Sequence, residues 1–502
     1  MIRTRNFLGS ITASLLLICV TISSANEVVA QGKRTIRIAI GTQDQVINTA
    51  TGGPIIREEK LLEKYLPKSG KYQNVDFKIE WSSYTSGPPI TNKMLAGQLD
   101  IGIMGDFPAT INMTTFQKKG NGVNTLFIST LGISPSGAGN AIMVPKDSPI
   151  RSIADLRGKE VSVPFGSAAH GMLLRALRGA GIDPVKDVKL VSQSPEVGGS
   201  NLKTSQIDAH ANFVPYGELF PYRGFARKIF DGAQTGVPTM HGVLVRSDFA
   251  KENPEVVVAY LKALLEANRM FREQPEVMSA KIEKWSSIDK EVVYMFLGPS
   301  GLQMLDPSIR TVNINALKGS VITLKQLGRL EESVKPDDVT KWIDDSFLKK
   351  AIAEMKLTAD GLQAAAVNYK ISGNDSLTKE PIKDAKKAAQ IWVDGEPTVR
   401  KYASITNMVK ALQGLSGQGK KIGSIFVQDA GKGWKLFASS SYFVRNGKDI
   451  SAFLLEKDAK DFATKSGAQV SDFTATQKLA NDNSKQNLST ERTPNISFKP
   501  NH

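Results

Sequence analysis

The chain of 502 residues is long enough for one large domain or for two to four ordinary ones. Its 41% hydrophobic and 23% charged residues exclude collagen-like, coiled-coil, wholly disordered and polytopic membrane proteins. A single Cys excludes a disulfide scaffold and a thiolate zinc or iron–sulfur site. The formal charge of +15 suits an anionic ligand or surface, but no basic run interleaved with aromatic residues indicates nucleic acid.

The first thirty residues have the pattern of a secretory signal peptide. Arg3 and Arg5 precede an uncharged stretch with its apolar centre at 15–20, and small residues follow. This pattern predicts export to the periplasm and removal of residues 1–30, with a cut near 23–25 as an alternative. The polar Ser and Thr residues in the stretch disfavour a membrane anchor. Removal of the signal peptide also removes Cys19, the only thiol.

Strand and helix patterns alternate at the start of the exported chain. Alternating polar and apolar residues predict a strand at 35–40, and two further strands are expected at 77–81 and 100–104. Apolar residues at near-helical spacing predict helices within 55–66 and 91–96. This alternation predicts an α/β domain with a largely parallel sheet.

A second series of the same kind follows. The uncharged stretch at 120–145 is broken by Asn, Ser, Gly and Pro, and is interpreted as strand, hinge and strand. The later elements of this series are strands at 160–164, 188–191 and 206–209 and helices at 152–156 and 167–180. From residue 254 to 355 the pattern is mainly helical.

The rest of the chain divides into three parts. Residues 356–387 are rich in turn-forming residues and are interpreted as a linker. Residues 388–475 form a separate block, with strand-like runs at 389–393 and 423–427 and a helical run at 456–464. Residues 476–502 contain few large apolar residues and are predicted to be disordered.

Five motifs in the first block resemble one family. They are Ser86-Gly87-Pro88, the runs DIGIMGDFPA at 100–109, DLRGKEV at 155–161 and GSAAH at 166–170, and KWIDDSFL at 341–348. In this order they resemble the nitrate/sulfonate/taurine class of periplasmic substrate-binding proteins of ABC importers. The resemblance covers roughly residues 33–355.

The resemblance implies a two-lobed periplasmic binding protein of type II, with a hinge between α/β lobes. Lobe one would be residues 33–135 plus 240–355, and lobe two residues 136–239. Loops that lead from strands into helices present unpaired N–H groups and the positive ends of helix dipoles. Several such ends around one cleft bind a sulfonate, nitrate or carboxylate without a buried Lys or Arg.

The candidate ligand-binding residues lie in these loops and on the facing lobe. They are Gln43, Ser86, Gly87, Gly105, Asp106, Phe107, Gly166, Ser167, Ala168, His170, His210 and Asn212. Ser167 is expected either to contact the ligand or simply to cap its helix. Asp106 is expected either to pair with a ligand ammonium, as taurine would offer, or to cap the next helix.

Two histidines depart from the family pattern. His210 stands where relatives tend to carry an aromatic residue, and His170 lies at the opposite helix. They are interpreted either as structural hydrogen-bonding residues or as ligands of an anion or a metal chelate. His241 is expected near the hinge in a structural role.

The last block resembles the NosL family of periplasmic copper-handling proteins. The matching residues are the runs at 391–395, 402–408, 426–429, 441–444 and 470–473, with Gly433-Trp434. No Cys pair precedes Ala389, Asn407 stands where the family would place a Cys, and Met408 is the remaining soft donor. Because copper(I) prefers thiolate and thioether ligands, the resemblance implies a small α+β domain that keeps its fold without its metal. A docking or spacer role is favoured over copper delivery.

The sequence therefore predicts a solute-binding component that delivers a small anionic or zwitterionic solute to an inner-membrane ABC permease. It is expected to have no catalytic residues, because no phosphate-binding loop, zinc helix or nucleophile elbow is present. It is also expected to be a monomer without cofactor or resident metal. A binder of copper or a metal complex is the alternative. An enzyme resembling a thiamin-pyrimidine synthase is disfavoured, since the exported chain lacks the Cys cluster of that enzyme.

Overall fold

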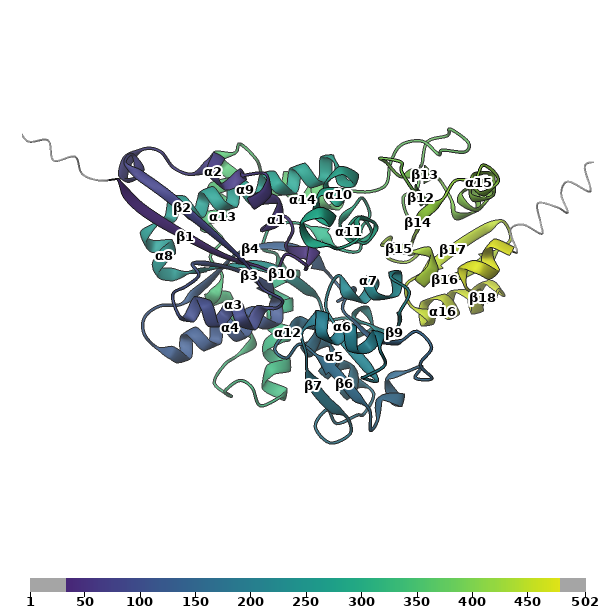
Figure 1. The fold of residues 1–502 in the computed structure, drawn as a ribbon, viewed down its shortest axis with the longest axis horizontal. Helices are drawn as coiled ribbons and strands as arrows, with labels where there is room; N and C mark the ends of the chain where they lie inside the picture. The colour runs from purple at the N-terminus through teal and green to yellow at the C-terminus, as the bar shows by residue number, and fades with distance from the viewer. Residues whose placement is uncertain (1–32, 479–502) are drawn as a thin grey trace, which may run out of the picture.

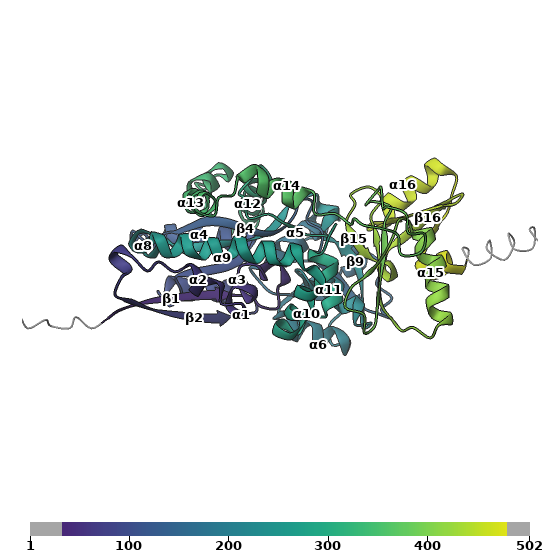
Figure 2. The ribbon, with the colours of Figure 1, turned by 90° about the horizontal axis from the view of Figure 1, so that it is seen from above.

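The computed structural model describes residues 33–478. The predicted signal peptide at 1–30 and residues 479–502 of the predicted disordered tail lie outside these residues. Two α/β lobes occupy most of the molecule, and a smaller C-terminal unit lies at the end opposite the first two strands (Figures 1 and 2).

A six-stranded sheet forms the centre of the first lobe. Its strand order is β11-β4-β10-β3-β1-β2. The strands are β1 (Arg34–Thr42), β2 (Val75–Ser83), β3 (Ile101–Gly105), β4 (Thr125–Ser134), β10 (Thr239–Arg246) and β11 (Met304–Leu305). Every residue of β3 is buried, as expected for a central strand covered on both faces.

A five-stranded sheet forms the centre of the second lobe, in the order β7-β6-β8-β5-β9. The strands are β5 (Ala141–Pro145), β6 (Glu160–Val163), β7 (Lys189–Ser192), β8 (Ala209–Asn212) and β9 (Ala226–Asp231). The chain passes between the two sheets from β4 to β5 and returns from β9 to β10, so these two connections form the hinge.

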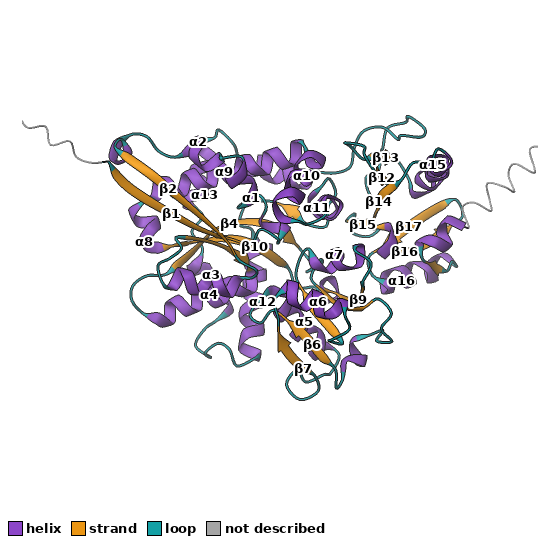
Figure 3. Ribbon diagram, in the orientation of Figure 1, coloured by secondary structure: helices purple, strands orange, loops and turns teal. Residues whose placement is uncertain are grey.

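Helices surround both sheets (Figure 3). Those of the first lobe are α1 (Pro54–Glu58), α2 (Leu61–Tyr65), α3 (Gly87–Leu95), α4 (Asp106–Lys119), α8 (Ser247–Glu252), α9 (Pro254–Glu273), α10 (Pro275–Ser286), α11 (Lys290–Leu297), α12 (Thr311–Gln326) and α13 (Ser346–Glu354). Those of the second lobe are α5 (Ala168–Gly179), α6 (Pro195–Lys203) and α7 (Tyr216–Tyr222). Short 3-10 helices are η1 (Ile47–Thr49), η2 (Gly70–Tyr72), η3 (Ile153–Leu156), η4 (Gly232–Thr235) and η5 (Pro336–Trp342).

The α/β class, the strands at 35–40, 77–81 and 100–104 and the helical stretch from 254 are confirmed. The prediction of largely parallel sheets is wrong, because both sheets are mixed. β1 pairs in parallel with β2 and β3, whereas β10 is antiparallel to β3 and β4. The second sheet likewise joins a parallel β7-β6-β8 part to antiparallel β5 and β9. Strands β4, β5, β9 and β10 in these antiparallel pairs are next to the hinge, where the chain leaves one lobe and enters the other, whereas β11 pairs antiparallel with β4 at the edge of the first sheet.

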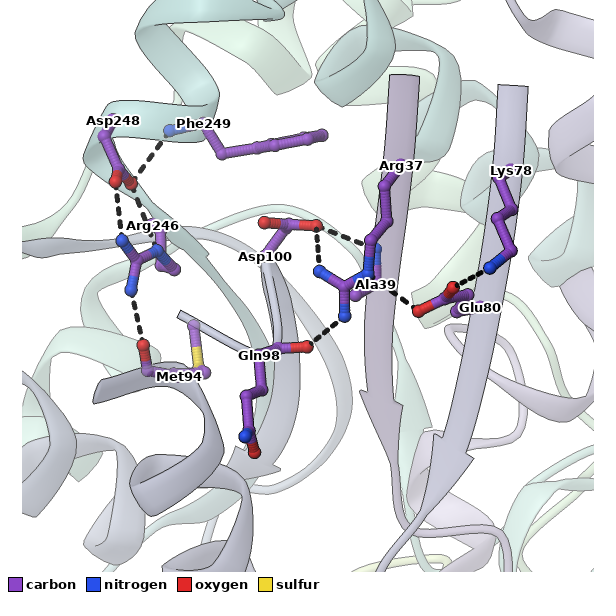
Figure 4. A network of polar contacts seen from close by, with 10 residues as sticks. All are labelled: Arg37, Ala39, Lys78, Glu80, Met94, Gln98, Asp100, Arg246, Asp248 and Phe249. Carbon is purple, nitrogen blue, oxygen red and sulfur yellow. Dashed lines mark hydrogen bonds and ion pairs between the residues drawn. The ribbon is translucent and has the colours of Figure 1, made fainter. Parts of the chain in front are cut away.

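A polar network fastens one edge of the first sheet (Figure 4). The carboxylate of Asp100, just before β3, accepts a hydrogen bond of 2.8 Å from the backbone N–H of Ala39 in β1. Arg37 donates to Glu80 in β2 at 2.7 Å and to the carbonyl of Gln98 at 2.6 Å. Because this network lies at the amino end of β3, it leaves the carboxyl ends of the strands, at Gly105, for the junction with the second lobe.

The C-terminal unit contains two small sheets. A four-stranded sheet has the order β13-β12-β14-β15, and a three-stranded sheet has the order β17-β16-β18. Their strands are β12 (Ala389–Val393), β13 (Arg400–Tyr402), β14 (Ile422–Gln428), β15 (Lys435–Phe437), β16 (Tyr442–Asn446), β17 (Asp449–Phe453) and β18 (Val470–Ser471). Its helices are α15 (Ile405–Gly417), η6 (Ala438–Ser440) and α16 (Glu456–Ser466).

The segment between the lobes and the C-terminal unit is structured. It contains α14 (Ala359–Val367) and an isolated pairing of Asn374 with Pro381. The buried carboxylate of Asp375 accepts hydrogen bonds of 2.7 to 3.0 Å from the backbone N–H groups of Leu377, Thr378 and Ala403. The side-chain amide of Asn407 donates a fourth bond of 2.7 Å, so Asp375 ties this segment to the start of α15. Within residues 33–478, no helix is long and apolar enough to cross a bilayer.

Asp375→Ala is expected to lower the free energy of unfolding by roughly 2–4 kcal/mol, because it leaves buried donors without an acceptor. Urea unfolding followed by circular dichroism measures the change. Asp360→Ala, at an exposed position of α14, is the matched control and should leave stability within about 0.5 kcal/mol of wild type. Equal stability of both variants would contradict the proposed role of this carboxylate.

Candidate functional site at the junction of the lobes

Three helices begin where the two lobes meet. A Cβ atom at Gly87, the first residue of α3, would lie 2.4 Å from Cβ of Pro108 in α4. A Cβ atom at Gly105, just before α4, would lie 3.5 Å from Cβ of Ala168, the first residue of α5. The amino-terminal ends of α3 and α4 in the first lobe therefore face that of α5 in the second. Such ends carry unpaired N–H groups and partial positive charge.

Gly166 makes this close approach of the lobes possible. Its φ of 76° lies in the left-handed region that other residues rarely adopt. A Cβ atom there would also lie 3.2 Å from Cγ of Pro88 in α3. A side chain at this position would therefore push the loop before α5 away from the first lobe.

The two serines of the predicted site differ in their bonding. Ser167 caps α5, because its hydroxyl accepts a hydrogen bond of 3.3 Å from the backbone N–H of His170. Ser86 stands in the same position before α3, but its hydroxyl makes no capping hydrogen bond and the residue is only half-buried. The hydroxyl of Ser86 is thus available to another partner, whereas the hydroxyl of Ser167 already accepts one hydrogen bond from its own helix.

Aromatic rings fill the space beside the helix ends. The side chain of Phe107 is buried, and a Cβ atom at Gly171 of α5 would lie only 2.8 Å from its ring. His170 stacks on the exposed ring of Phe165 with 4.8 Å between centroids, and its Nδ1 accepts a hydrogen bond of 3.1 Å from the N–H of Gly166. Phe107 and Phe165 therefore hold the His170 ring at the boundary of the junction.

Asp106 is fully buried, and its carboxylate accepts hydrogen bonds from β10, next to the hinge, and from α12. Its Oδ1 accepts hydrogen bonds from the hydroxyl of Thr239 at 2.8 Å and the N–H of Met240 at 3.2 Å, and its Oδ2 accepts one from Ser320 at 2.6 Å. Burial raises the pKa of Asp106, while these donors and the guanidinium of Arg175 act in the opposite direction. The carboxylate thus links the start of α4 to β10 and α12.

His210 and Asn212 lie on β8, the central strand of the second sheet. His210 is completely buried, with Nδ1 2.6 Å from the hydroxyl of Ser162 and Nε2 2.9 Å from Nδ2 of Asn212. A Cβ atom at Gly198 of α6 would lie 2.1 Å from its ring. Both nitrogens of the imidazole are therefore bonded to neighbouring side chains under α6.

The structure adds His241 and Asn48 to the residues at the junction. His241 in β10 lies opposite Gly105 in β3, and its Nε2 lies 3.6 Å from the position of a Cβ at Gly105. Its Nδ1 is 3.3 Å from Nδ2 of Asn48, whose buried Oδ1 has no hydrogen-bond partner among the described residues. Gln43, another predicted site residue, donates to the carbonyl of Ile103 in β3 at 2.9 Å. The sequence predicts His241 near the hinge, but only the antiparallel register of β10 and β3 places it opposite Gly105, and sequence periodicity does not give that register.

All three histidines in the lobes are neutral at pH 7. Burial lowers the pKa of His170 to about 4, with a smaller contribution from Arg329. Burial also lowers the pKa of His210 and of His241 to about 3. They offer neutral hydrogen-bonding groups rather than positive charge.

The lobes are in contact across the junction. The hydroxyl of Tyr216 in the second lobe donates to Gln45 in the first at 3.0 Å. On the other side, Arg178 of α5 donates to the carbonyl of Gln326 at the end of α12, at 2.8 Å. The described residues thus have the closed arrangement of two lobes.

The site is distinct from a surface hollow of about 590 Å³ on the second lobe. Lys146, Lys203, Asp208 and Phe225 are among the residues that line this hollow. Asp208 precedes β8 whereas Asn212 ends it. The hollow therefore lies at the amino-terminal end of β8, opposite the end that carries Asn212. Between residues 33 and 478, no group of three or more His, Cys, Asp or Glu is arranged to hold a metal ion.

Comparisons with known proteins agree with this architecture. Residues 90–278 match the family described as NMT1/THI5 like. A "Putative aliphatic sulfonates-binding protein" of Escherichia coli strain K12 is 27% identical over 246 residues, which are 49% of this chain and 72% of the relative. The taurine-binding periplasmic protein of the same strain is 30% identical over 213 residues, 42% of this chain and 62% of the relative.

Solved structures show the same fold. The alkanesulfonate-binding protein SsuA of Xanthomonas axonopodis pv. citri, bound to MOPS, superposes with a TM-score of 0.50 and 22% identity. It covers 62% of this chain, and the match includes 98% of that protein. The periplasmic nitrate-binding protein NrtA of Synechocystis PCC 6803 has a TM-score of 0.50 and 17% identity, over 65% of this chain and 90% of that protein. At these identities the likeness concerns the fold alone.

The buried histidines predict a loss of stability in mild acid. Because their pKa values are lower in the folded chain, the unfolded chain binds more protons below pH 6.5. The free energy of unfolding should be constant from pH 8 to 7 and fall between pH 6 and 5, by about 1.4 kcal/mol per pH unit for each histidine. Urea unfolding at half-unit pH steps measures this slope.

His170→Gln is the matched variant, since it removes one of the three imidazoles at a position that is not completely buried. Between pH 6 and 5, the free energy of unfolding of this variant should fall less steeply than that of wild type, by about 1.4 kcal/mol per pH unit for the one missing histidine. A slope equal to that of wild type would show that His170 takes up its proton in the folded chain.

Proposed function

We propose that this protein captures a small anionic or zwitterionic solute between its two lobes in the periplasm and delivers it to an inner-membrane ABC permease. The observation that supports this most directly is the meeting of the amino-terminal ends of α3, α4 and α5, contributed by both lobes. Helix ends of this kind bind sulfonate, nitrate or carboxylate groups through backbone N–H donors. A solute held by both lobes would favour the closed arrangement over an open one.

The proposed contacts are the N–H groups of Asp106, Phe107, Ala168 and Ala169 and the hydroxyl of Ser86. The N–H groups lie in the first turns of α4 and α5, where no carbonyl of the same helix can accept from them. His241 is added as a neutral donor, because its Nδ1 is beside Asn48 while its Nε2 faces Gly105. The unpartnered Oδ1 of Asn48 offers an acceptor for the ammonium of a zwitterion or for a water.

The remaining predicted contacts that stay part of the proposal are Gln43, Gly87, Gly105, Gly166, Ser167 and His170. His210 and Asn212 are buried with their side-chain polar atoms bonded to protein groups, so they are proposed to support the site without contacting the solute. Relatives named for binding sulfonates and taurine support a sulfonate as the first solute to test. We further propose that the protein is exported and that residues 1–30 are then removed. We also propose that it is a monomer and has no catalytic role. Residues 388–475 are proposed as a NosL-like domain without copper ligands.

A thermal-unfolding screen tests the solute class. The mature protein purified from the periplasm is mixed with methanesulfonate, taurine, nitrate, bicarbonate, dicarboxylates or a copper salt. A solute at 100 times its dissociation constant stabilises the folded chain by about 2.7 kcal/mol, which is a clear rise in Tm. A rise with the sulfonates or another small anion supports the proposal. A rise with copper alone, or with none of the compounds, contradicts it.

Replacement of the two serines tests the site. With the anion that gives the largest rise in Tm, Ser86→Ala and Ser167→Ala are each expected to weaken binding about tenfold, because a hydrogen bond to a charged group contributes roughly 1.5 kcal/mol. Isothermal titration calorimetry measures the dissociation constants. Ser404→Ala is the matched control, since Ser404 caps α15 in the same way but lies in the C-terminal unit. Unchanged affinity in both site variants would place the anion elsewhere.

A further inference from the structure

One face of the four-stranded sheet in the C-terminal unit is buried against the lobes. The pairings of Gln390 with Phe426 and of Phe426 with Phe437 place these three side chains side by side on that face. Lys435 and Gln428, also paired, lie on the same face. Each of the five residues is less than 5% exposed. A sheet face of this kind needs a fixed partner, which the lobes supply.

The larger part of this contact is made with α11 of the first lobe. The ring of Tyr294 lies 5.4 Å from that of Trp392 and 5.5 Å from that of Phe426, measured between centroids. Its hydroxyl accepts a hydrogen bond of 2.9 Å from Gln390, and Nζ of Lys435 lies 3.5 Å from the centre of its ring. The side chain of Tyr294 is fully buried as a result. These contacts anchor the C-terminal unit to the first lobe.

A second contact is made with the second lobe. The ring of Tyr222, at the end of α7, stacks on that of Phe437 with 5.0 Å between centroids and 26° between planes. The hydroxyls of Tyr222 and Ser424 are 3.4 Å apart. α7 belongs firmly to the second lobe, because a Cβ atom at Gly217 would lie 2.7 Å from Cβ of Ala141 in β5. The same sheet face therefore touches both lobes.

We propose that the C-terminal unit is an intramolecular strap that holds the two lobes in the closed arrangement. Hinge opening in a two-lobed protein moves one lobe as a rigid body against the other. Because the sheet is anchored on Tyr294 and also stacks on Tyr222, α7 cannot move away from α11 while both contacts persist. The Tyr222 contact is the smaller of the two and is half-exposed, so it is the one that breaks when the lobes open.

The distance between the lobes tests the strap directly. Spin labels are attached at Lys93→Cys in α3 and Val185→Cys in the second lobe, in the full chain with Cys19→Ser; both positions are exposed. Double electron–electron resonance without any solute should give one short distance for wild type. Tyr222→Ala should add a second population at longer distance, because the second lobe loses its stacking on the C-terminal unit and keeps only direct contacts with the first lobe, such as Arg223 with Asp289 at 2.8 Å.

Phe462→Ala is the matched control, since it also removes a half-buried ring but one that packs on Phe453 within the C-terminal unit. It should keep the wild-type distance. If Tyr222→Ala misfolds by circular dichroism, Tyr222→Leu keeps apolar bulk and loses the stacking and the hydroxyl. A distance distribution of the Tyr222 variant that superposes on wild type, or an equal change in Phe462→Ala, overturns the strap. Because no solute is present, this result is independent of whether the proposed anion binds.

Discussion

The position of the amino-terminal end of α4 at the junction depends on the burial of one carboxylate, that of Asp106. A buried carboxylate is tolerated only where donors surround it, and here the donors come from β10 and α12, with the Arg175 guanidinium of α5 acting on its charge. Asp106 is also the first residue of α4. The same residue therefore fixes the direction of the helix end that faces α5 and ties that end to the returning strand of the hinge. Loss of the Ser320 hydroxyl would leave Oδ2 of this buried carboxylate without its hydrogen bond.

This constraint is consistent with the proposed binding of an anion by neutral groups, without a salt bridge at the site. The charge of +15 raises the local concentration of anions near the surface, an effect that acts at long range and weakens with salt. The groups proposed to contact the anion are neutral: N–H groups of helix ends, the hydroxyl of Ser86 and imidazoles whose pKa values are lowered by burial. The net charge would therefore attract the anion at long range, while neutral groups would recognise it at the site. That recognition would depend on the position of the α4 end, which Asp106 fixes.

The sequence predicts local features of this site better than its long-range ones. Turn residues after apolar runs place Ser86, Gly105 and Ser167 at strand-to-helix connections, and the structure has helices beginning at these places. His241 could not be recognised as a neighbour of Gly105, because that proximity depends on the register of β10 against β3. The mixed sheets were missed for the same reason, since the patterns of single strands do not reveal which strands return through the hinge. The orientation of Asp106 depends on Thr239 and Ser320, which are 133 and 214 residues away in the chain.

The strap and the solute would act on the same equilibrium between open and closed lobes. A solute that needs the closed arrangement binds with an apparent affinity reduced by the fraction of the protein that is closed. Raising that fraction from about one tenth to about nine tenths would tighten binding about ninefold without any new contact to the solute. The same contact slows entry and release, because the stacked rings of Tyr222 and Phe437 must part before the lobes can open. A binding protein with such a strap would release its solute slowly and retain it well, and the proposed permease would have to supply interactions that favour the open lobes.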